Sequence, residues 1–183
     1  MAPKAIVSTD DATPRLFALD TSAVVAALID TQPKHDVYRD FVTGAIENSS
    51  TFIFSELLDV ELAGVCEKNS RSEKHRSTKR MLESRNDTLD RVMGAWEDVL
   101  ELVDHTRLPI RESHDAQGWE HAYALAIDLL RSYPIRINDA IHAATAIILS
   151  VPLLTDDDDF ARIPRLSIVT EPGKVAAMNA KRR

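Results

Sequence analysis

With 183 residues, 44% of them hydrophobic and 28% charged, the chain is long enough for one substantial core and has the balance of a globular protein. It lacks both a run near the roughly 18 apolar residues that span a membrane and a secretory segment, and one cysteine excludes a disulfide framework. We expect a cytoplasmic protein, and its net charge of −7 argues against broad nonspecific binding to nucleic acid.

The first predicted unit is a strand that runs into a capped helix. Residues 1–15 show no apolar periodicity, so we interpret them as a flexible leader. Residues 16–19 form a continuous apolar run, which is typical of a strand buried on both faces. Asp20, Thr21 and Ser22 follow this strand and can cap the helix AVVAALID.

The next segment repeats this order of elements. An amphipathic helix is expected over 35–46, because its apolar residues recur at three-and-four spacing. The β-branched and aromatic run 51–54 then predicts a second strand. Ser55 is placed to cap the helix that follows over 56–65. Here too, a helix that contains acidic residues directly follows a strand.

Glu61 is the acid of this second helix that lacks a simple structural explanation. Its neighbours at the three-and-four positions are Leu57, Leu58, Gly64 and Val65. Glu61 therefore shares the inward face, where an unpaired carboxylate is costly. Asp59 is expected to point to solvent instead.

Residues 67–102 have an interrupted helical pattern that predicts two helices, which can form a hairpin. Trp96 and Trp119 fit core positions of helices better than stacking platforms for bases. Within this region, residues 68–85 hold seven Lys or Arg against two acids, a local excess of +5. Such a segment is usually a solvated face, and contact with phosphates is the alternative.

The remaining pattern completes an α/β domain. Residues 100–103 either finish the preceding helix or form a short strand. The later elements are a helix over 114–131, a helix that begins at Asp139, a strand over 151–155 and a last edge strand over 168–170. Strands that alternate with helices predict an open, mostly parallel β-sheet flanked by helices. We place a single domain at 16–172 and a basic tail at 173–183.

Four chain segments bring acids toward one edge of this sheet. Asp20 and the run 156–159 directly follow strands, Glu61 lies in the helix after another strand, and Asp139 opens a helix. Loops and helix starts gather beyond the carboxyl ends of parallel strands. Taken alone, Asp20 and Asp139 are equally well explained as helix-capping acids, and most of the aspartate run is expected to be solvated loop.

Carboxylates that converge on one pocket repel one another and raise each other's pKa unless divalent cations lie between them. Mg²⁺, or Mn²⁺, is the natural ion for a site of hard oxygen ligands. His142 follows Asp139 by three residues and is expected at the surface, with a catalytic role at the same rim as the alternative.

These residues bear a family resemblance. Over about 16–170 the chain resembles the PIN-domain ribonucleases, most closely the VapC-like toxins of bacterial toxin–antitoxin pairs. LDTSAVVAAL is similar to the first motif, SELLDVELAGV to the second, RINDAIHAATAIIL to the third and LLTDDDDFARIP to the closing T-x-D-x-D-F segment. The resemblance places the four acids of the family at Asp20, Glu61, Asp139 and Asp157, with Asp156 or Asp159 as alternatives for the last.

The resemblance implies Mg²⁺-dependent hydrolysis of RNA phosphodiester bonds, with one or two ions held by these four acids. It also implies a cognate antitoxin whose basic side chain enters the acidic groove, and a homodimer. Four polar residues are candidates to orient the carboxylates or bound water, with helix capping as the alternative: Thr21, Ser22, Asn138 and Thr155.

Two other functions compete with this hypothesis. One is a non-catalytic PIN-like module for RNA binding or scaffolding, in which the acids are vestigial. The other is a phosphatase similar to the haloacid dehalogenases, which need a D-x-D-x-T motif after the first strand. The segment LDTSA lacks that motif, so we favour the ribonuclease.

Overall fold

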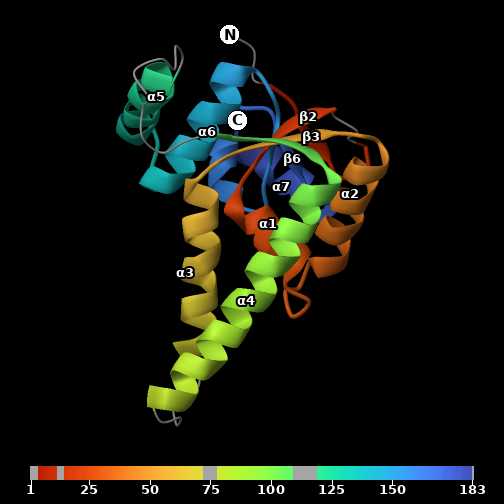
Figure 1. The fold of residues 1–183 in the computed structure, drawn as a ribbon. Helices are drawn as coiled ribbons and strands as arrows, with labels where there is room; N and C mark the ends of the chain where they lie inside the picture. The colour runs from red at the N-terminus through yellow and green to blue at the C-terminus, as the bar shows by residue number, and fades with distance from the viewer. Residues whose placement is uncertain (1–3, 12–14, 72–77, 109–118, 183) are drawn as a thin grey trace.

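The computed structural model describes residues 4–11, 15–71, 78–108 and 119–182. In these residues six strands form one sheet in the order β1-β6-β5-β2-β3-β4, and every neighbouring pair is parallel. The strands are β1 (Ile6–Ser8), β2 (Leu16–Leu19), β3 (Thr51–Ser55), β4 (Asp104–Leu108), β5 (Leu153–Leu154) and β6 (Ile168–Thr170). The predicted α/β fold with an open parallel sheet is confirmed (Figure 1).

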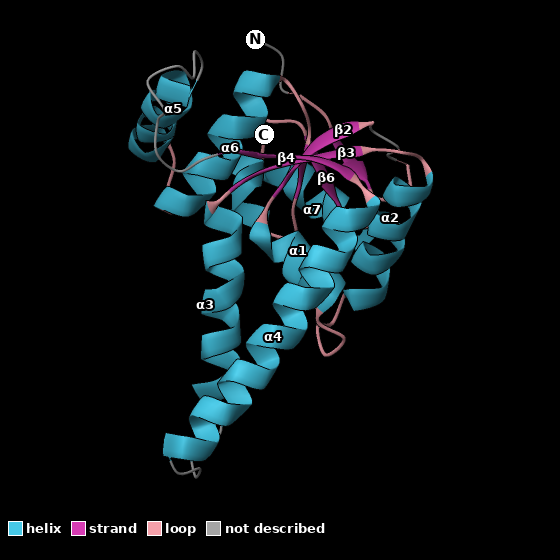
Figure 2. Ribbon diagram, in the orientation of Figure 1, coloured by secondary structure: helices cyan, strands magenta, loops and turns pink. Residues whose placement is uncertain are grey.

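Helices cover both faces of the sheet (Figure 2). They are α1 (Thr21–Leu28), α2 (His35–Glu47), α3 (Leu57–Arg71), α4 (Thr78–Leu102), α5 (Trp119–Ser132), α6 (Ile137–Leu149), the 3-10 helix η1 (Asp158–Arg162) and α7 (Pro172–Lys181). Phe17 and Leu19 of β2 pack in the core shared with α1, α2, α3 and α4, whereas Ala18 packs in the core shared with α5, α6, η1 and α7. This alternation explains why β2 is apolar throughout. No described helix is long and apolar enough to cross a lipid bilayer.

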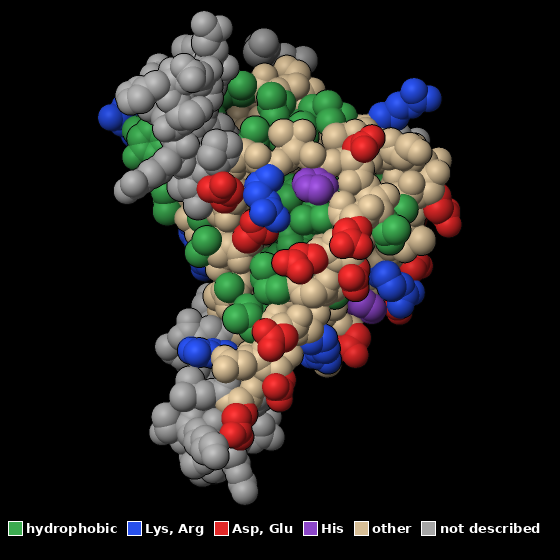
Figure 3. All heavy atoms as spheres, viewed as in Figure 1, with side chains coloured by type: hydrophobic (Ala, Val, Ile, Leu, Met, Phe, Trp, Pro, Cys, Tyr) green, Lys and Arg blue, Asp and Glu red, His purple; other side chains and the backbone are tan. Residues whose placement is uncertain are grey.

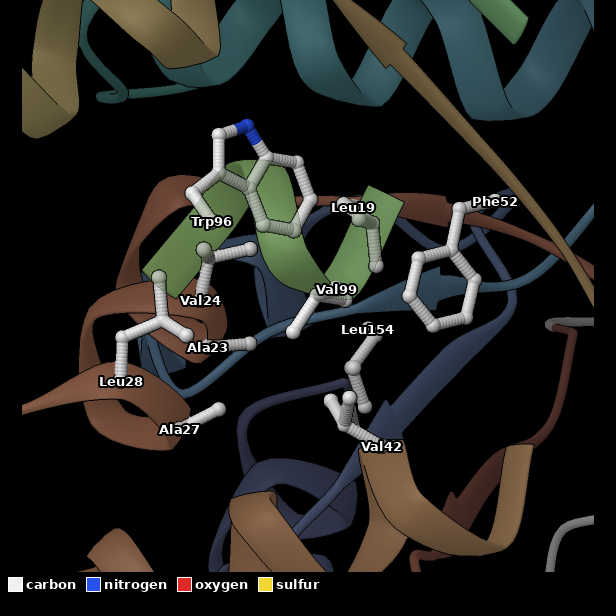
Figure 4. A pocket seen from close by; sticks show the side chains of 10 residues that line it. All are labelled: Leu19, Ala23, Val24, Ala27, Leu28, Val42, Phe52, Trp96, Val99 and Leu154. Carbon is white, nitrogen blue, oxygen red and sulfur yellow. The ribbon is translucent and has the colours of Figure 1, made fainter. Parts of the chain in front are cut away.

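The first core encloses a small apolar cavity of about 10 Å³ between β2, α1 and α4 (Figure 4). Its lining residues are Leu19, Ala23, Val24, Ala27, Leu28, Val42, Phe52, Trp96, Val99 and Leu154. A space of this size holds about one water molecule, and an apolar lining offers water no partner. The cavity is therefore a local packing gap.

The prediction of a flexible leader is wrong for the residues before β2 that the structure describes. Ile6 pairs with Ile168, so β1 forms the edge of the sheet beside β6. Residues 168–170 are accordingly not an edge strand. A strand this short carries no periodicity of its own, because pairing with a distant segment stabilises it. Residues 1–3 and 12–14 of the predicted leader lie outside the described part.

The prediction of a basic tail is also wrong. Residues 172–181 form α7, and Met178 is fully buried in the second core. After this helix, the Arg182 guanidinium donates hydrogen bonds to the backbone carbonyls of Leu166 (2.6 Å), Ala161 (3.2 Å) and Lys4. The folded domain therefore extends beyond the predicted limits of 16–172 at both ends.

Arg182→Met should destabilise the protein by roughly 2 kcal/mol, because the backbone carbonyls that accept hydrogen bonds from the Arg182 guanidinium would lose these bonds. Chemical denaturation measures this change in the free energy of unfolding. Arg165→Met is the matched control, because Arg165 is exposed on the neighbouring loop. Equal stability of the two variants would contradict the role given to Arg182.

The prediction of two helices over 67–102 is wrong for the residues that the structure describes, because α3 extends the helix predicted over 56–65 to Arg71 and only α4 lies wholly within 67–102. The two helices pack against each other and project from the sheet as a hairpin (Figure 1). Residues 100–102 finish α4, and β4 begins at Asp104. Trp96 is buried, as predicted. The side chain of Trp119 and most of the basic segment 68–85 lie outside the described part.

Asp59 does not point to solvent as predicted. Its Oδ1 accepts a hydrogen bond from Trp96 Nε1 (3.1 Å), and its Oδ2 pairs with Arg107 on β4 (3.3 Å). Ser55 is the last residue of β3, and its buried hydroxyl makes no hydrogen bond in the described part of the chain. The predicted capping role of Ser55 is therefore wrong.

Acidic side chains follow α4 along the face shown in Figure 3. The exposed acids among the described side chains of α4 are Glu83, Asp87, Asp90, Glu97, Asp98 and Glu101. Their like charge would repel phosphate groups. These acids therefore disfavour nucleic acid along the described part of this face.

Candidate functional site

The predicted acids lie where the order of the strands reverses. From β2 the chain continues to β3 and β4 on one side, and it later returns to place β5 on the other side of β2. The crevice beyond such a switch point is the usual ligand site of an open parallel sheet. Asp20 follows β2, residues 155–157 follow β5, and the backbone N–H of Asp20 donates to the carbonyl of Leu154 (3.0 Å).

Asp20 is the most enclosed acid of the site, with 4% of its surface exposed. It caps α1, and its Oδ2 accepts hydrogen bonds from the Thr155 hydroxyl (2.8 Å) and from the hydroxyl and N–H of Ser22. Burial raises the pKa of Asp20, although His142 and these hydrogen bonds oppose the shift. No described group donates a hydrogen bond to Oδ1, so this oxygen is available to a ligand.

Glu61 lies on the inward side of α3, as its helical position predicted. The Thr21 hydroxyl and His142 Nε2 (2.9 Å) contact its Oε2, and Asn138 Nδ2 donates to its Oε1 (2.7 Å). Burial alone would raise the pKa of Glu61, but the hydrogen bonds from His142 and Thr21 outweigh it and the pKa is lowered. Glu61 is therefore charged and joins α1, α3 and α6.

His142 is buried, with 2% of its surface exposed, so the prediction of a surface histidine is wrong. Burial lowers its pKa, but the hydrogen bond to Glu61 and the charge of Asp20 reverse the effect and the pKa is raised. One feature of the sequence indicates that His142 is buried. The helix IHAATAII is apolar on all sides, and such helices are buried all round.

Asp139 is the third residue of α6, and its Oδ2 accepts a hydrogen bond from the backbone N–H of Arg136 (3.1 Å). Burial, followed by the charges of Asp20 and Asp157, raises its pKa to about 6. Asp139 thus lies within electrostatic reach of acids from two other chain segments.

The four aspartates after β5 face different partners. Asp157 caps η1 by accepting a hydrogen bond from the N–H of Asp159 (2.8 Å), and its charge acts on Asp139. Asp156 pairs with Lys34 (2.8 Å), whereas Asp159 pairs with Arg162 (3.3 Å) and is 45% exposed in its side chain. Asp157 is therefore the member of the run whose charge acts on Asp139.

The donors of this cluster suit Mg²⁺ in their chemistry. Asp20, Asp139 and Asp157 each keep one carboxylate oxygen that accepts no hydrogen bond from the described residues. In the same part of the chain, however, no three His, Cys, Asp or Glu side chains are already arranged to hold an ion. An ion would therefore have to draw the carboxylates together. All four predicted orienting residues contact a member of the cluster: Thr21 and Asn138 contact Glu61, and Ser22 and Thr155 contact Asp20.

Comparison with known proteins gives a family and a set of similar folds. The PIN domain family model matches residues 17–166. A sequence comparison with curated proteins gave no match. DNA-bound VapBC from Salmonella typhimurium shares 20% identity and a TM-score of 0.55, covering 84% of this chain and 96% of that chain.

Two further structures show the same likeness. FitAcB from Neisseria gonorrhoeae shares 18% identity and a TM-score of 0.55, covering 84% of this chain and 96% of that chain. VapBC2 from Rickettsia felis, bound to a promoter DNA fragment, shares 19% identity and a TM-score of 0.51, covering 85% and 98%. At such low sequence identity, the similarity to these structures shows a shared fold only. Because the family model spans most of the sequence, the chain belongs to the PIN domain family.

Proposed function

We propose that this protein is a Mg²⁺-dependent endoribonuclease that hydrolyses RNA phosphodiester bonds as the toxin of a toxin–antitoxin pair. One observation carries the proposal: Asp139, with a pKa raised to about 6, lies within electrostatic reach of Asp20 and Asp157 at the carboxyl edge of the sheet. Such a cluster of acids calls for a divalent cation. Membership of the PIN domain family and the fold shared with VapBC and FitAcB chains support it.

In this proposal the free oxygens of Asp20, Asp139 and Asp157 hold the ion. When bound, Mg²⁺ supplies an activated water and stabilises the leaving oxygen. The hydroxyls of Ser22 and Thr155 fix Oδ2 of Asp20 and so set the direction of its other oxygen.

Glu61 has a different position in this proposal, because both of its oxygens already accept hydrogen bonds. It would reach the ion through a water molecule and would hold His142 in place. His142, with its raised pKa, balances part of the negative charge of the site. This balance lets several acids remain ionised in a small volume.

The proposed partners follow from the same acidic cluster. A cognate antitoxin would place a basic side chain among the free carboxylate oxygens, where a cation is favoured. The VapBC structure from Rickettsia felis contains a promoter DNA fragment, and DNA binding by the assembled complex is proposed for this protein too. We also propose a homodimer, which sedimentation of the purified protein would test.

Cleavage of RNA should require the metal and should leave 5′-phosphate and 3′-hydroxyl ends. We expect the purified protein to cleave RNA in the presence of Mg²⁺ or Mn²⁺. Cleavage should stop when EDTA is added and should resume when Mg²⁺ is added in excess of EDTA. Labelling of the product ends with and without prior dephosphorylation identifies the end chemistry.

Cleavage that EDTA leaves unchanged would contradict a metal-dependent mechanism. Failure to bind Mn²⁺ in calorimetry, together with retained RNA binding, would instead support the non-catalytic PIN-like module. A catalytically silent sample would first be freed of bound antitoxin by denaturation and refolding, so that inhibition is not mistaken for inactivity.

A further inference from the structure

Two lysines outside the acid cluster hold the aspartate run. Lys34, at the start of α2, pairs with Asp156 Oδ1 (2.8 Å) and with Glu171 Oε1 (2.9 Å). Lys174 on α7 pairs with Asp156 Oδ1 (3.2 Å) and Asp158 Oδ1 (3.1 Å). Their side chains are between 18% and 36% exposed, so these pairs are partly shielded from solvent. Partial shielding makes ion pairs stronger than those at a free surface.

Tyr38 adds a buried hydrogen-bonding group to the same side. Its ring is completely buried, and its hydroxyl lies 2.9 Å from the carbonyl of Thr155 and 3.1 Å from Asp156 Oδ1. The hydroxyl also accepts a hydrogen bond from the N–H of Glu171 (3.3 Å). Lys34 and Tyr38 are four residues apart on consecutive turns, so one end of α2 presents both groups to the run.

The opposite side of the run is fixed by the two hydroxyls that bind Asp20. The N–H of Asp156 donates to Ser22 Oγ (2.9 Å), and the N–H of Asp157 donates to Thr155 Oγ1 (2.9 Å). Both hydroxyls donate in turn to Oδ2 of Asp20. The backbone of the run is therefore tied to the acid cluster, while the carboxylate of Asp156 is tied to α2 and α7.

This arrangement decides which aspartate meets the cluster. Asp157 has an extended backbone, with φ −92° and ψ 122°. Asp156, at a bend, has its carboxylate held by Lys34. The N–H of Asp157 donates to the Thr155 hydroxyl that binds Asp20, and one carboxylate oxygen of Asp157 accepts no hydrogen bond from the described residues. Asp157 is therefore the aspartate with an oxygen to offer beside Asp20, and its charge acts on Asp139. A slip by one residue would exchange the two carboxylates.

We propose that Lys34 and Tyr38 are positioning residues, which set the register of residues 155–157 so that Asp157, and neither Asp156 nor Asp159, completes the acid cluster. They touch neither metal nor RNA in this role. The inference rests on the proposed function for its effect on catalysis, but the register itself exists without metal and is measurable in the metal-free protein.

Amide hydrogen exchange in the metal-free protein tests this role. We expect Lys34→Met and Tyr38→Phe to speed exchange roughly tenfold at the amides of Asp157 and Asp159, because their acceptors are side-chain oxygens of Thr155 and Asp157 within the segment whose register would change. The amide of Thr155, which donates to the carbonyl of Val169, should keep its protection. Faster exchange at all three amides would indicate general destabilisation and would overturn the positioning role.

Matched variants distinguish an effect on the register of residues 155–157 from a general effect of charge or of helix stability. Arg39→Met removes a cation from the same helix, where Arg39 pairs only with the exposed Asp36 and Asp40 among the described residues, and should behave as wild type. Lys34→Arg keeps the cation and should restore slow exchange. If Lys34→Met and Tyr38→Phe exchange at the wild-type rate, the inference is wrong.

Mn²⁺ calorimetry distinguishes failure of this inference from failure of the proposed function. Changes to residues that support metal ligands weaken metal binding by about 10- to 100-fold, so we expect a loss in this range for Lys34→Met. Wild-type affinity in Lys34→Met would overturn the inference and leave the proposed function standing. A wild-type protein that binds no Mn²⁺ would overturn the proposed function, and amide exchange would still decide the register.

Discussion

Asp20→Asn should reduce metal-dependent RNA cleavage roughly 1,000-fold, the equivalent of about 4 kcal/mol of transition-state stabilisation. Asparagine keeps the volume of the side chain and can still accept hydrogen bonds from Ser22 and Thr155. It removes the charge that would hold the ion. The fold should therefore persist, with a melting temperature near that of wild type, while the single-turnover cleavage rate falls.

Asp128→Asn provides the matched control for this experiment. Asp128 lies on α5, 65% exposed in its side chain, and pairs with Arg131 (3.4 Å). The substitution makes the same change of charge away from the acid cluster and should leave cleavage unchanged. Wild-type cleavage by Asp20→Asn, in a sample free of contaminating ribonuclease, would end the proposal of an active site at this edge.

Asp139→Asn should abolish metal binding and at the same time stabilise the metal-free protein at neutral pH. The folded state raises the pKa of Asp139 from 3.8 to about 6, so the folded protein binds this proton more tightly than the unfolded chain does. Asp139 therefore lowers the free energy of unfolding as the pH rises from about 4 to about 6. The full shift corresponds to about 3 kcal/mol, and screening of a partly exposed group reduces this to roughly 1–2 kcal/mol.

Urea denaturation at several pH values measures this effect. Asp139→Asn should exceed wild type in stability at pH 7.5, and the difference should vanish toward pH 4. Saturating Mg²⁺ should stabilise wild type and leave Asp139→Asn unchanged, because only a site that binds the ion gains stability from it. Asparagine can still accept the hydrogen bond from the Arg136 N–H, so a variant less stable than wild type at pH 7.5 would contradict the predicted repulsion at Asp139.

The sequence was sufficient to predict what depends on local pattern and connectivity. Asp20 could be placed at the carboxyl edge because it directly follows an apolar run, and Glu61 could be placed inward from its helical neighbours. His142 could not be placed from its own polarity, because its burial depends on distant segments that cover the middle of α6, where residues 142–146 are buried. In the proposed register, the choice of Asp157 within the run depends on Lys34, which contacts Asp156 from more than 100 residues away in the sequence.

The elements at the two ends of the fold, β1 and α7, likewise could not be predicted from the local sequence. β1 is too short to have a pattern of its own and is formed by its pairing with β6, so its residues resemble a leader. α7 has one fully buried side chain, Met178, and its remaining residues are mostly small or polar. In both cases a distant partner supplies the stabilising contacts, and neither partner is visible in the local sequence.

The strand order also bears on when the acids can come together during synthesis. β2 can pair with β3 early, but its other neighbour, β5, is made after β3 and β4, and Asp157 follows β5 in the chain. β1 cannot pair with its neighbour until β6 has been made. A nascent chain therefore carries Asp20 and Glu61 before Asp139 and Asp157 have been made. The acidic pocket can assemble only after synthesis has passed β5.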